Sequence, residues 1–202
     1  MRYLVTGGAG FIGSNLVDEL INQGNEVVCL DINDKGYWNE QAENYIGWDV
    51  CDSTKMNILM EGVNTLFHLA AEVKIQETIA DPVKCYNTNV IGTSVVLEAA
   101  RKHGVKKVVF SSTSAIYKCD WLIQPEESAE DSSLNPYASS KRSAEDLCKL
   151  YSTCYGMNTT ILRYFNVYGN RQHSEGQYAP VLGIFIRQKN ENKPLTLSLI
   201  HI

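Results

Sequence analysis

Short apolar runs alternate along this chain with longer segments of helical periodicity. The apolar runs read as strands buried on both faces of a sheet, or as short strands between turn signals, and they cover about 3–5, 26–30, 44–48, 65–71, 107–110 and 159–163. Because strand and helix patterns alternate, we predict a parallel sheet of six or seven strands, with right-handed crossovers and helices on both faces.

The segments between the apolar runs carry the start and stop signals of helices. Asp52 can cap the helix that follows it, and Asn135 with Pro136 forms a cap and a good first helical residue. A basic turn and a glycine at 102–104 end a long amphipathic pattern. After the first helix, the predicted helices cover about 53–60, 82–102, 136–154 and 181–187.

A glycine-rich stretch, TGGAGFIG at 6–13, joins the first apolar run to the first helix. Gly7, Gly10 and Gly13 would permit a tight turn, a bare backbone surface for a pyrophosphate, and close packing of helix on strand. The second apolar run ends in Asp31, about 20 residues downstream, where a dinucleotide-binding fold places its ribose-binding acid. A glycine triplet alone also occurs in plain connectors, so this context favours a dinucleotide site.

Two other polar groups are predicted near the carboxyl edge of the sheet. Four hydroxyl residues at 111–114 follow one apolar run, although such residues often only form turns. Tyr137 and Lys141 lie one turn apart on one face of the predicted helix, a spacing that is common on helices. Residues 118–134, with Pro125 and several acidic residues, are expected to form an exposed loop.

Composition narrows the classes of function. With 202 residues, 44% hydrophobic residues and a net charge of −5, the chain is typical of one α/β domain without a basic surface for nucleic acid. The six cysteines have no CxxC spacing and the four histidines are isolated, so we expect reduced thiols and no metal site. No leader pattern and no run of eighteen apolar residues occur, so we expect a cytoplasmic protein with no membrane partner.

Motifs spread over nearly the whole chain resemble those of the extended short-chain dehydrogenase/reductase family, specifically its NAD-dependent nucleotide-sugar epimerases and dehydratases. The matching pieces are TGGAGFIG at 6–13, LD at 30–31, D at 49, HLAA at 68–71, NTNVIGT at 87–93, SST at 111–113, YASSK at 137–141 and RYFNVYGNRQ at 163–172. The resemblance implies a Rossmann-like doubly wound parallel sheet and NAD as the cofactor.

The same resemblance implies a set of site residues. Thr113, Tyr137 and Lys141 match the catalytic triad, and Asn166 would meet the phosphate of the sugar nucleotide, with Thr113 also contacting substrate. Tyr137 would take a proton from a sugar hydroxyl, with Lys141 favouring its phenolate. Besides Tyr137 and Lys141, the implied cofactor contacts are Gly7, Gly10, Phe11, Ile12, Gly13, Asp31, Asp49, Val50, Leu69, Ala70, Ala71, Thr88 and Phe165.

The chain departs from the family pattern at three places. Ser114-Ala115 stands where dehydratases carry Asp-Glu after the triad threonine, which disfavours dehydration, and Tyr117-Lys118 replaces the usual Tyr-Gly. After residue 196 the family pattern stops. We therefore expect a cofactor domain over 1–175 and only the start of a truncated substrate lobe over 176–202.

The resemblance favours a UDP-sugar 4-epimerase that forms a homodimer through the helices near 82–103 and 135–154. Two other classes stay open: a uronate decarboxylase or a reductase with the same triad, and a catalytically silent dinucleotide-binding module. The intact triad speaks against a silent module, whereas the short C-terminal part speaks for it.

Overall fold

The computed structural model describes residues 1–117, 135–172 and 181–196. They belong to two compact units, Met1–Phe165 and Asn166–Ile202. The first unit therefore ends ten residues before the domain boundary expected near 175, and that boundary stays a prediction. The expected loop at 118–134 lies outside the described residues.

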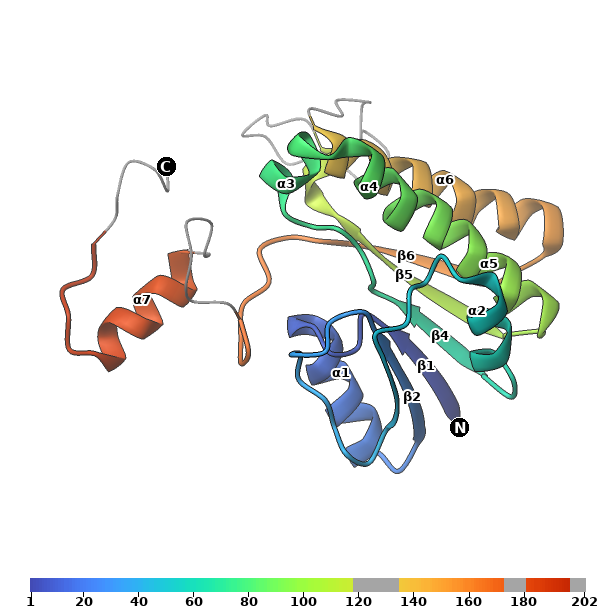
Figure 1. Ribbon diagram of the computed structural model, residues 1–202, viewed down its shortest axis with the longest axis horizontal. Coiled ribbons are helices and arrows are strands. Elements are labelled where there is room, and N and C mark those ends of the chain that lie inside the picture. The colour runs from blue at the N-terminus through green and yellow to red at the C-terminus, as the bar shows by residue number, and fades with distance from the viewer. Residues whose placement is uncertain (118–134, 173–180, 197–202) are drawn as a thin grey trace. The chain divides into compact units, whose positions relative to one another are not determined.

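The first unit is built on a parallel sheet, as the alternation of strands and helices predicts (Figure 1). Its six described strands lie in the order β3-β2-β1-β4-β5-β6, so the direction of winding reverses between β1 and β4. The strands are β1 (Arg2–Thr6), β2 (Glu26–Asp31), β3 (Glu43–Ile46), β4 (Thr65–His68), β5 (Lys107–Thr113) and β6 (Thr159–Tyr164).

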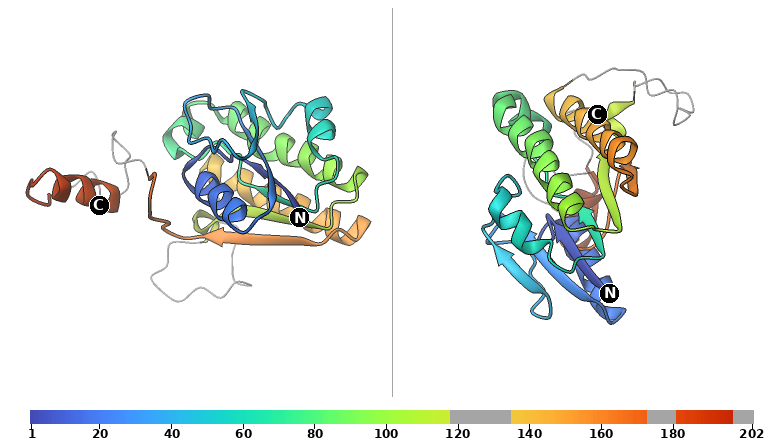
Figure 2. Two further views of the ribbon diagram at one scale, coloured as in Figure 1. Left: turned by 90° about the horizontal axis from the view of Figure 1, so that it is seen from below. Right: turned by 90° about the vertical axis from the view of Figure 1, so that its right-hand side faces the viewer.

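Neighbouring residues of a central strand point to opposite faces of the sheet, and both faces are covered by packed apolar side chains. Leu4 packs in the larger apolar cluster with residues of α2, α5 and α6, whereas Val5 packs in a second cluster with residues of α1. Figure 2 shows α5 and α6 together on one side of the sheet. The helices of this unit are α1 (Phe11–Asn22), α2 (Ser53–Leu59), α3 (Ile75–Ala80), α4 (Pro82–Tyr86), α5 (Gly92–Lys102) and α6 (Pro136–Tyr155).

Helix termini follow the capping chemistry expected from sequence. The Asp52 side chain accepts hydrogen bonds from two backbone N–H groups of α2, and Asn135 accepts one from Ala138 at the start of α6. Helix α6 ends at Tyr155 and is capped by Gly156, whose φ of 67° suits glycine. In the second unit, α7 (Val181–Asn190) is three residues longer than expected.

The long helix expected over 82–102 is one helical run with an irregular centre. A π-helical turn, η1 (Asn87–Ile91), separates α4 from α5, and the short helix α3 precedes them without a clear sequence signal. The strand expected over 65–71 ends at His68, whereas the strand expected over 107–110 continues to Thr113. Within the described part of the chain, no helix is both long and apolar enough to cross a membrane.

Gly13 is predicted to be a stability determinant of the first unit. A Cβ atom at Gly13 would press directly on the carbonyl oxygen of Gly7 and come within 2.8 Å of the Cα of Gly8. Because these are backbone atoms, Gly13→Ala should lower the free energy of unfolding by about 1–3 kcal/mol. Urea unfolding followed by circular dichroism measures this change. Glu19→Ala on the exposed face of α1 is the control and should change it by less than about 0.5 kcal/mol. Equal effects of the two substitutions would contradict the packing role.

Candidate active site

The glycine turn between β1 and α1 is shaped for close approach of a ligand. Gly7 has a φ of 70°, and a Cβ atom there would lie 2.7 Å from the backbone nitrogen of Ala70. Gly10 is different, because a Cβ atom at this position would meet only the Gly7 carbonyl oxygen, at 3.3 Å. The turn is thus packed on one side, at Gly7 and Gly13, and open at Gly10.

Helix α1 begins at Phe11 and Ile12 without a side-chain cap and without an acidic residue in its first turn. Its first N–H groups and the positive end of its dipole are therefore available to an anion. Both features fit the pyrophosphate of a dinucleotide. A capping or acidic side chain, which would compete with such a ligand, is missing from this turn.

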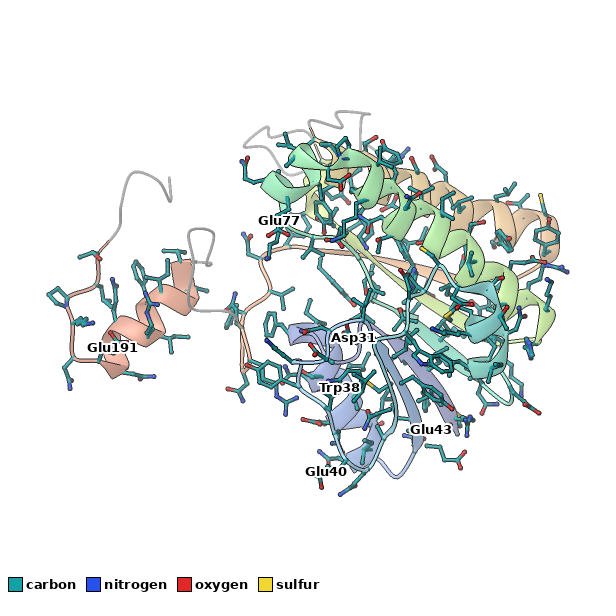
Figure 3. The ribbon with its side chains drawn as sticks, in the orientation of Figure 1. Asp31, Trp38, Glu40, Glu43, Glu77 and Glu191 are labelled. Carbon is teal, nitrogen blue, oxygen red and sulfur yellow. The ribbon has the colours of Figure 1, made fainter. Side chains whose placement is uncertain are left out.

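Asp31 lies at the carboxyl end of β2, beside the start of α1 (Figure 3). Its Oδ2 accepts a hydrogen bond from the backbone N–H of Ala9 at 3.1 Å, and its Oδ1 accepts one from Asn33 at 3.0 Å. These bonds fix the carboxylate against the glycine turn. Because each carboxylate oxygen can accept a second hydrogen bond, a diol can still bind there.

The segment after β4 lies directly against the glycine turn. The backbone N–H of Leu69 donates to the carbonyl oxygen of Thr6, and that of Ala70 donates to the Thr6 hydroxyl. Leu69, Ala70 and Ala71 are all half-buried. The structure therefore brings Leu69 and Ala70 next to Gly7, and Ala71 follows directly after them.

The predicted adenine contacts lie beside the π-helical turn. Val50 is buried, and its side chain would lie 2.8 Å from a Cβ atom placed at Gly92. Asp49 is exposed and accepts a hydrogen bond from the backbone N–H of Cys51, whereas Thr88 is half-buried within η1.

Asn89, in the same π-helical turn, joins the segment after β4 to α6. It exchanges two hydrogen bonds with the backbone of Glu72 and donates a third to the Ser140 hydroxyl, which itself donates to the carbonyl oxygen of Tyr137. Sequence reasoning did not identify Asn89 as a site residue. The π-helical turn is the structural signal, because such turns often occur at functional sites.

Thr113 and Tyr137 meet at the carboxyl edge of the sheet. Thr113 is the last residue of β5 and Tyr137 lies in the first turn of α6. Burial raises the pKa of Tyr137, and its hydrogen bond with Thr113 acts in the opposite direction. The side chains predicted to be the proton acceptor and its partner are thus in contact.

Lys141 is buried one turn after Tyr137, and its ammonium donates to the carbonyl oxygen of Ser111 at 2.8 Å. Burial lowers the pKa of Lys141 to about 8. In the structure, burial is the main influence on the pKa of Tyr137, and the effect of Lys141 on its phenolate stays a prediction.

Phe165 follows β6 and is 67% exposed. Its ring stacks on that of Tyr117, with centroids 5.9 Å apart and an angle of 23° between the planes. The predicted substrate contact Asn166 is exposed and belongs to the second unit.

A buried ion pair was also missed by sequence reasoning. Glu145 lies one turn after Lys141 on α6 and binds Arg163 of β6 through both carboxylate oxygens. The four-residue spacing from Lys141 was a usable signal, because it places Glu145 on the face of α6 that carries Lys141.

Known proteins share this arrangement of elements. A family model described as the NAD dependent epimerase/dehydratase family matches residues 3–199. The structure of UDP-glucose 4-epimerase from Thermotoga maritima with UDP-glucose is 37% identical, with a TM-score of 0.87 and coverage of 96% of this chain and 64% of that one. The UDP-glucose 4-epimerase complex with NAD from Thermus thermophilus is 34% identical, with a TM-score of 0.85 and coverage of 98% and 65%.

Relatives with another activity are also similar. A UDP-N-acetyl-alpha-D-glucosaminuronate decarboxylase of Bacillus cytotoxicus is 39% identical over 199 residues, which cover 92% of this chain and 60% of the relative. This chain spans 52–63% of the length of three curated relatives, of which two are named as UDP-glucose 4-epimerases and the third is this decarboxylase. The match of the family model over nearly the whole chain shows that this chain belongs to the NAD dependent epimerase/dehydratase family.

Proposed function

We propose that this chain carries the cofactor-binding and catalytic part of a nucleotide-sugar 4-epimerase that acts on a UDP-sugar. The observation that carries the proposal is the meeting of Thr113, the last residue of β5, and Tyr137, in the first turn of α6, at the carboxyl edge of the sheet. The glycine turn opens at the same edge, where open α/β sheets bind their ligands.

The bare glycine turn and the uncapped start of α1 fit NAD, which when bound would supply a reversible acceptor for the hydride on C4 of the sugar. Five residues would hold its pyrophosphate: Gly7, Gly10, Phe11, Ile12 and Gly13. The remaining contacts would be Asp31 at the adenosine ribose, Asp49 and Val50 at adenine, Leu69, Ala70, Ala71 and Thr88 along the cofactor, and Phe165 at the nicotinamide.

The triad residues would orient the sugar hydroxyl and accept its proton. Tyr137 would take the proton of the C4 hydroxyl, and Thr113 would orient that hydroxyl by a hydrogen bond. Because burial raises the pKa of Tyr137, proton transfer needs positive charge nearby. With a pKa of about 8, Lys141 is mostly protonated at pH 7 and brings such a charge one helical turn away. Asn166 would bind the phosphate of the sugar nucleotide.

The residues after Thr113 favour epimerisation over dehydration. Ser114 and Ala115 form a short 3₁₀ turn, η2 (Ser114–Ile116), and the Ala115 backbone N–H donates to the Thr113 hydroxyl. This turn therefore carries no carboxyl pair that could expel water. A uronate decarboxylase is the second candidate, because the Bacillus cytotoxicus relative has that activity in its name.

We also propose that two copies of the chain pair through the helical run near 82–103, which ends in α5, and through α6 near 135–154. These helices lie side by side in Figures 1 and 2. Apolar side chains remain exposed on η1 and α6, including Ile91 at 54% and Leu150 at 50%. Pairing of the two helices with those of a second copy would cover this surface.

A titration and an assay together test the proposed function. We expect the 202-residue chain to bind NAD but to bind UDP-glucose weakly and to epimerise it slowly, because the relatives extend beyond the region matched here. Joining the chain to the part of a full-length relative that it does not cover should restore both. Calorimetry with NAD and with UDP-glucose, beside a coupled epimerase assay, gives the answer. Release of carbon dioxide from a UDP-uronate would favour the decarboxylase instead.

The second prediction is a preference for NAD over NADP of at least about tenfold, because Asp31 would accept the ribose hydroxyls and repel a 2′-phosphate. Asp31→Ala should remove most of this preference. Glu26→Ala, at the opposite end of β2, is the matched control and should preserve it. Calorimetric titration with each cofactor measures the ratio, and equal affinities in the unmodified chain would contradict the assignment.

The third prediction separates chemistry from binding. Tyr137→Phe in an active form of the protein should lower kcat by about 10²–10⁴-fold, because only the hydroxyl that transfers the proton is lost. NAD affinity should change little. Tyr151 lies on the same helix as Tyr137, and its hydroxyl donates a hydrogen bond to Glu98 of α5. Tyr151→Phe, the control, should keep the parental kcat. A near-parental rate for Tyr137→Phe would exclude Tyr137 as the base.

A further inference from the structure

Glu145 and Arg163 form a buried charged pair that the proposed chemistry does not use. The Glu145 side chain is completely buried, and 15% of the Arg163 side chain is exposed. The carboxylate accepts from Arg163 Nε at 2.8 Å, from Arg163 Nη2 at 2.7 Å and from the Ser112 hydroxyl at 2.6 Å. Burial raises the pKa of Glu145, but the hydrogen bonds from Arg163 and Ser112 outweigh it and lower the pKa below its usual range.

Such a pair is a poor means of stabilising a fold. Removing two charges from water costs about as much as their attraction returns, and apolar residues of similar volume often stabilise equally well. A bidentate arginine–carboxylate pair does provide fixed geometry, because the planar guanidinium can bind in one orientation only. The role of this pair therefore depends on which group the oriented guanidinium contacts.

The guanidinium holds Tyr117. Arg163 Nη1 donates to the Tyr117 hydroxyl at 3.0 Å, and the Arg163 Cζ atom lies 5.0 Å from the centre of the Tyr117 ring. Tyr117 in turn contacts Phe165, because the two rings stack on each other. Phe165 is otherwise largely exposed, so Tyr117 is its aromatic support.

We propose that Glu145 and Arg163 are positioning residues that fix the Phe165 ring, through Tyr117, for the nicotinamide end of the cofactor. The inference rests on the proposed function in one respect, the contact of Phe165 with nicotinamide. Glu145 orients the Arg163 guanidinium, Arg163 orients the Tyr117 hydroxyl, and the Tyr117 ring restricts Phe165. The ion pair thus acts on the cofactor without touching it.

The chain offers a matched control for this pair. On the solvent-exposed side of α5, Glu98 accepts from Nε and Nη2 of Arg101 at 2.8 Å each, and the Arg101 Cζ atom lies 5.0 Å from the centre of the Tyr155 ring. This second cluster has the same chemistry, but Arg101 lies in the last turn of α5, which leads to the amino end of β5. It should have no effect on the nicotinamide end.

The experiment compares NAD with ADP-ribose, which lacks nicotinamide. Calorimetric titrations are made with the 202-residue chain and with Phe165→Ala, Tyr117→Phe, Arg163→Lys and the control Arg101→Lys. We expect the first three variants to weaken NAD binding at least about fivefold more than ADP-ribose binding, and Arg101→Lys to affect both equally. Tyr117→Phe leaves the ion pair intact and should remain folded by circular dichroism at the temperature of the titration, so its selective loss would not reflect damage to the fold.

The outcomes separate this inference from the proposed function. Selective loss in Phe165→Ala, together with unchanged ratios in Tyr117→Phe and Arg163→Lys, would overturn the positioning role and leave the cofactor contact standing. No selective loss in Phe165→Ala would refute the cofactor contact and the inference with it. Failure of the joined, full-length form to epimerise UDP-glucose would contradict the proposed function only, because the comparison of NAD with ADP-ribose needs no turnover.

Discussion

The close contact between the glycine turn and the segment after β4 is the constraint on which the rest of the site depends. These two segments lie at the point where the sheet reverses its winding, because β1 pairs with β2 on one side and with β4 on the other. Gly7 can approach Ala70 this closely only without a Cβ atom. Its packing sets the distance between the start of α1, which fits the pyrophosphate, and the half-buried residues that would line the cofactor.

Local chemistry made most of the fold predictable. The glycine turn, the cap at Asn135 and the two-sided burial of the central strands are encoded by residues within a few positions of each other, so sequence patterns predicted the sheet and the main helices. The glycines and the acid of the proposed dinucleotide site could be predicted for the same reason. Asp31 is an example, because its position after an apolar run is visible without a structure.

The parts that sequence reasoning missed depend on contacts between distant segments. The π-helical turn is held by Asn89, whose partners lie 17 and 51 residues away, and no local pattern distinguishes it from an ordinary helix. The spacing of Glu145 from Lys141 indicates its face of α6, but its partner Arg163 lies 18 residues later on another element, which no local pattern reveals. The lowered pKa of Lys141 likewise follows from burial under neighbouring elements, which the spacing of Tyr137 and Lys141 does not reveal.

Buried polar groups connect the glycine turn to the π-helical turn through one histidine. The Thr93 hydroxyl donates to the Asn89 carbonyl oxygen at 2.6 Å, so it must accept from His68 Nε2, which lies 3.0 Å away. His68 Nδ1 must then accept from the Thr6 hydroxyl, which itself accepts from the Ala70 N–H. This arrangement requires a neutral imidazole, and burial together with the charge of Lys141 agrees with it by lowering the pKa of His68 to about 3. The fixed tautomer of His68 therefore links the segment after β4 to the π-helical turn, and Asn89 links that turn to α6, the helix of Tyr137.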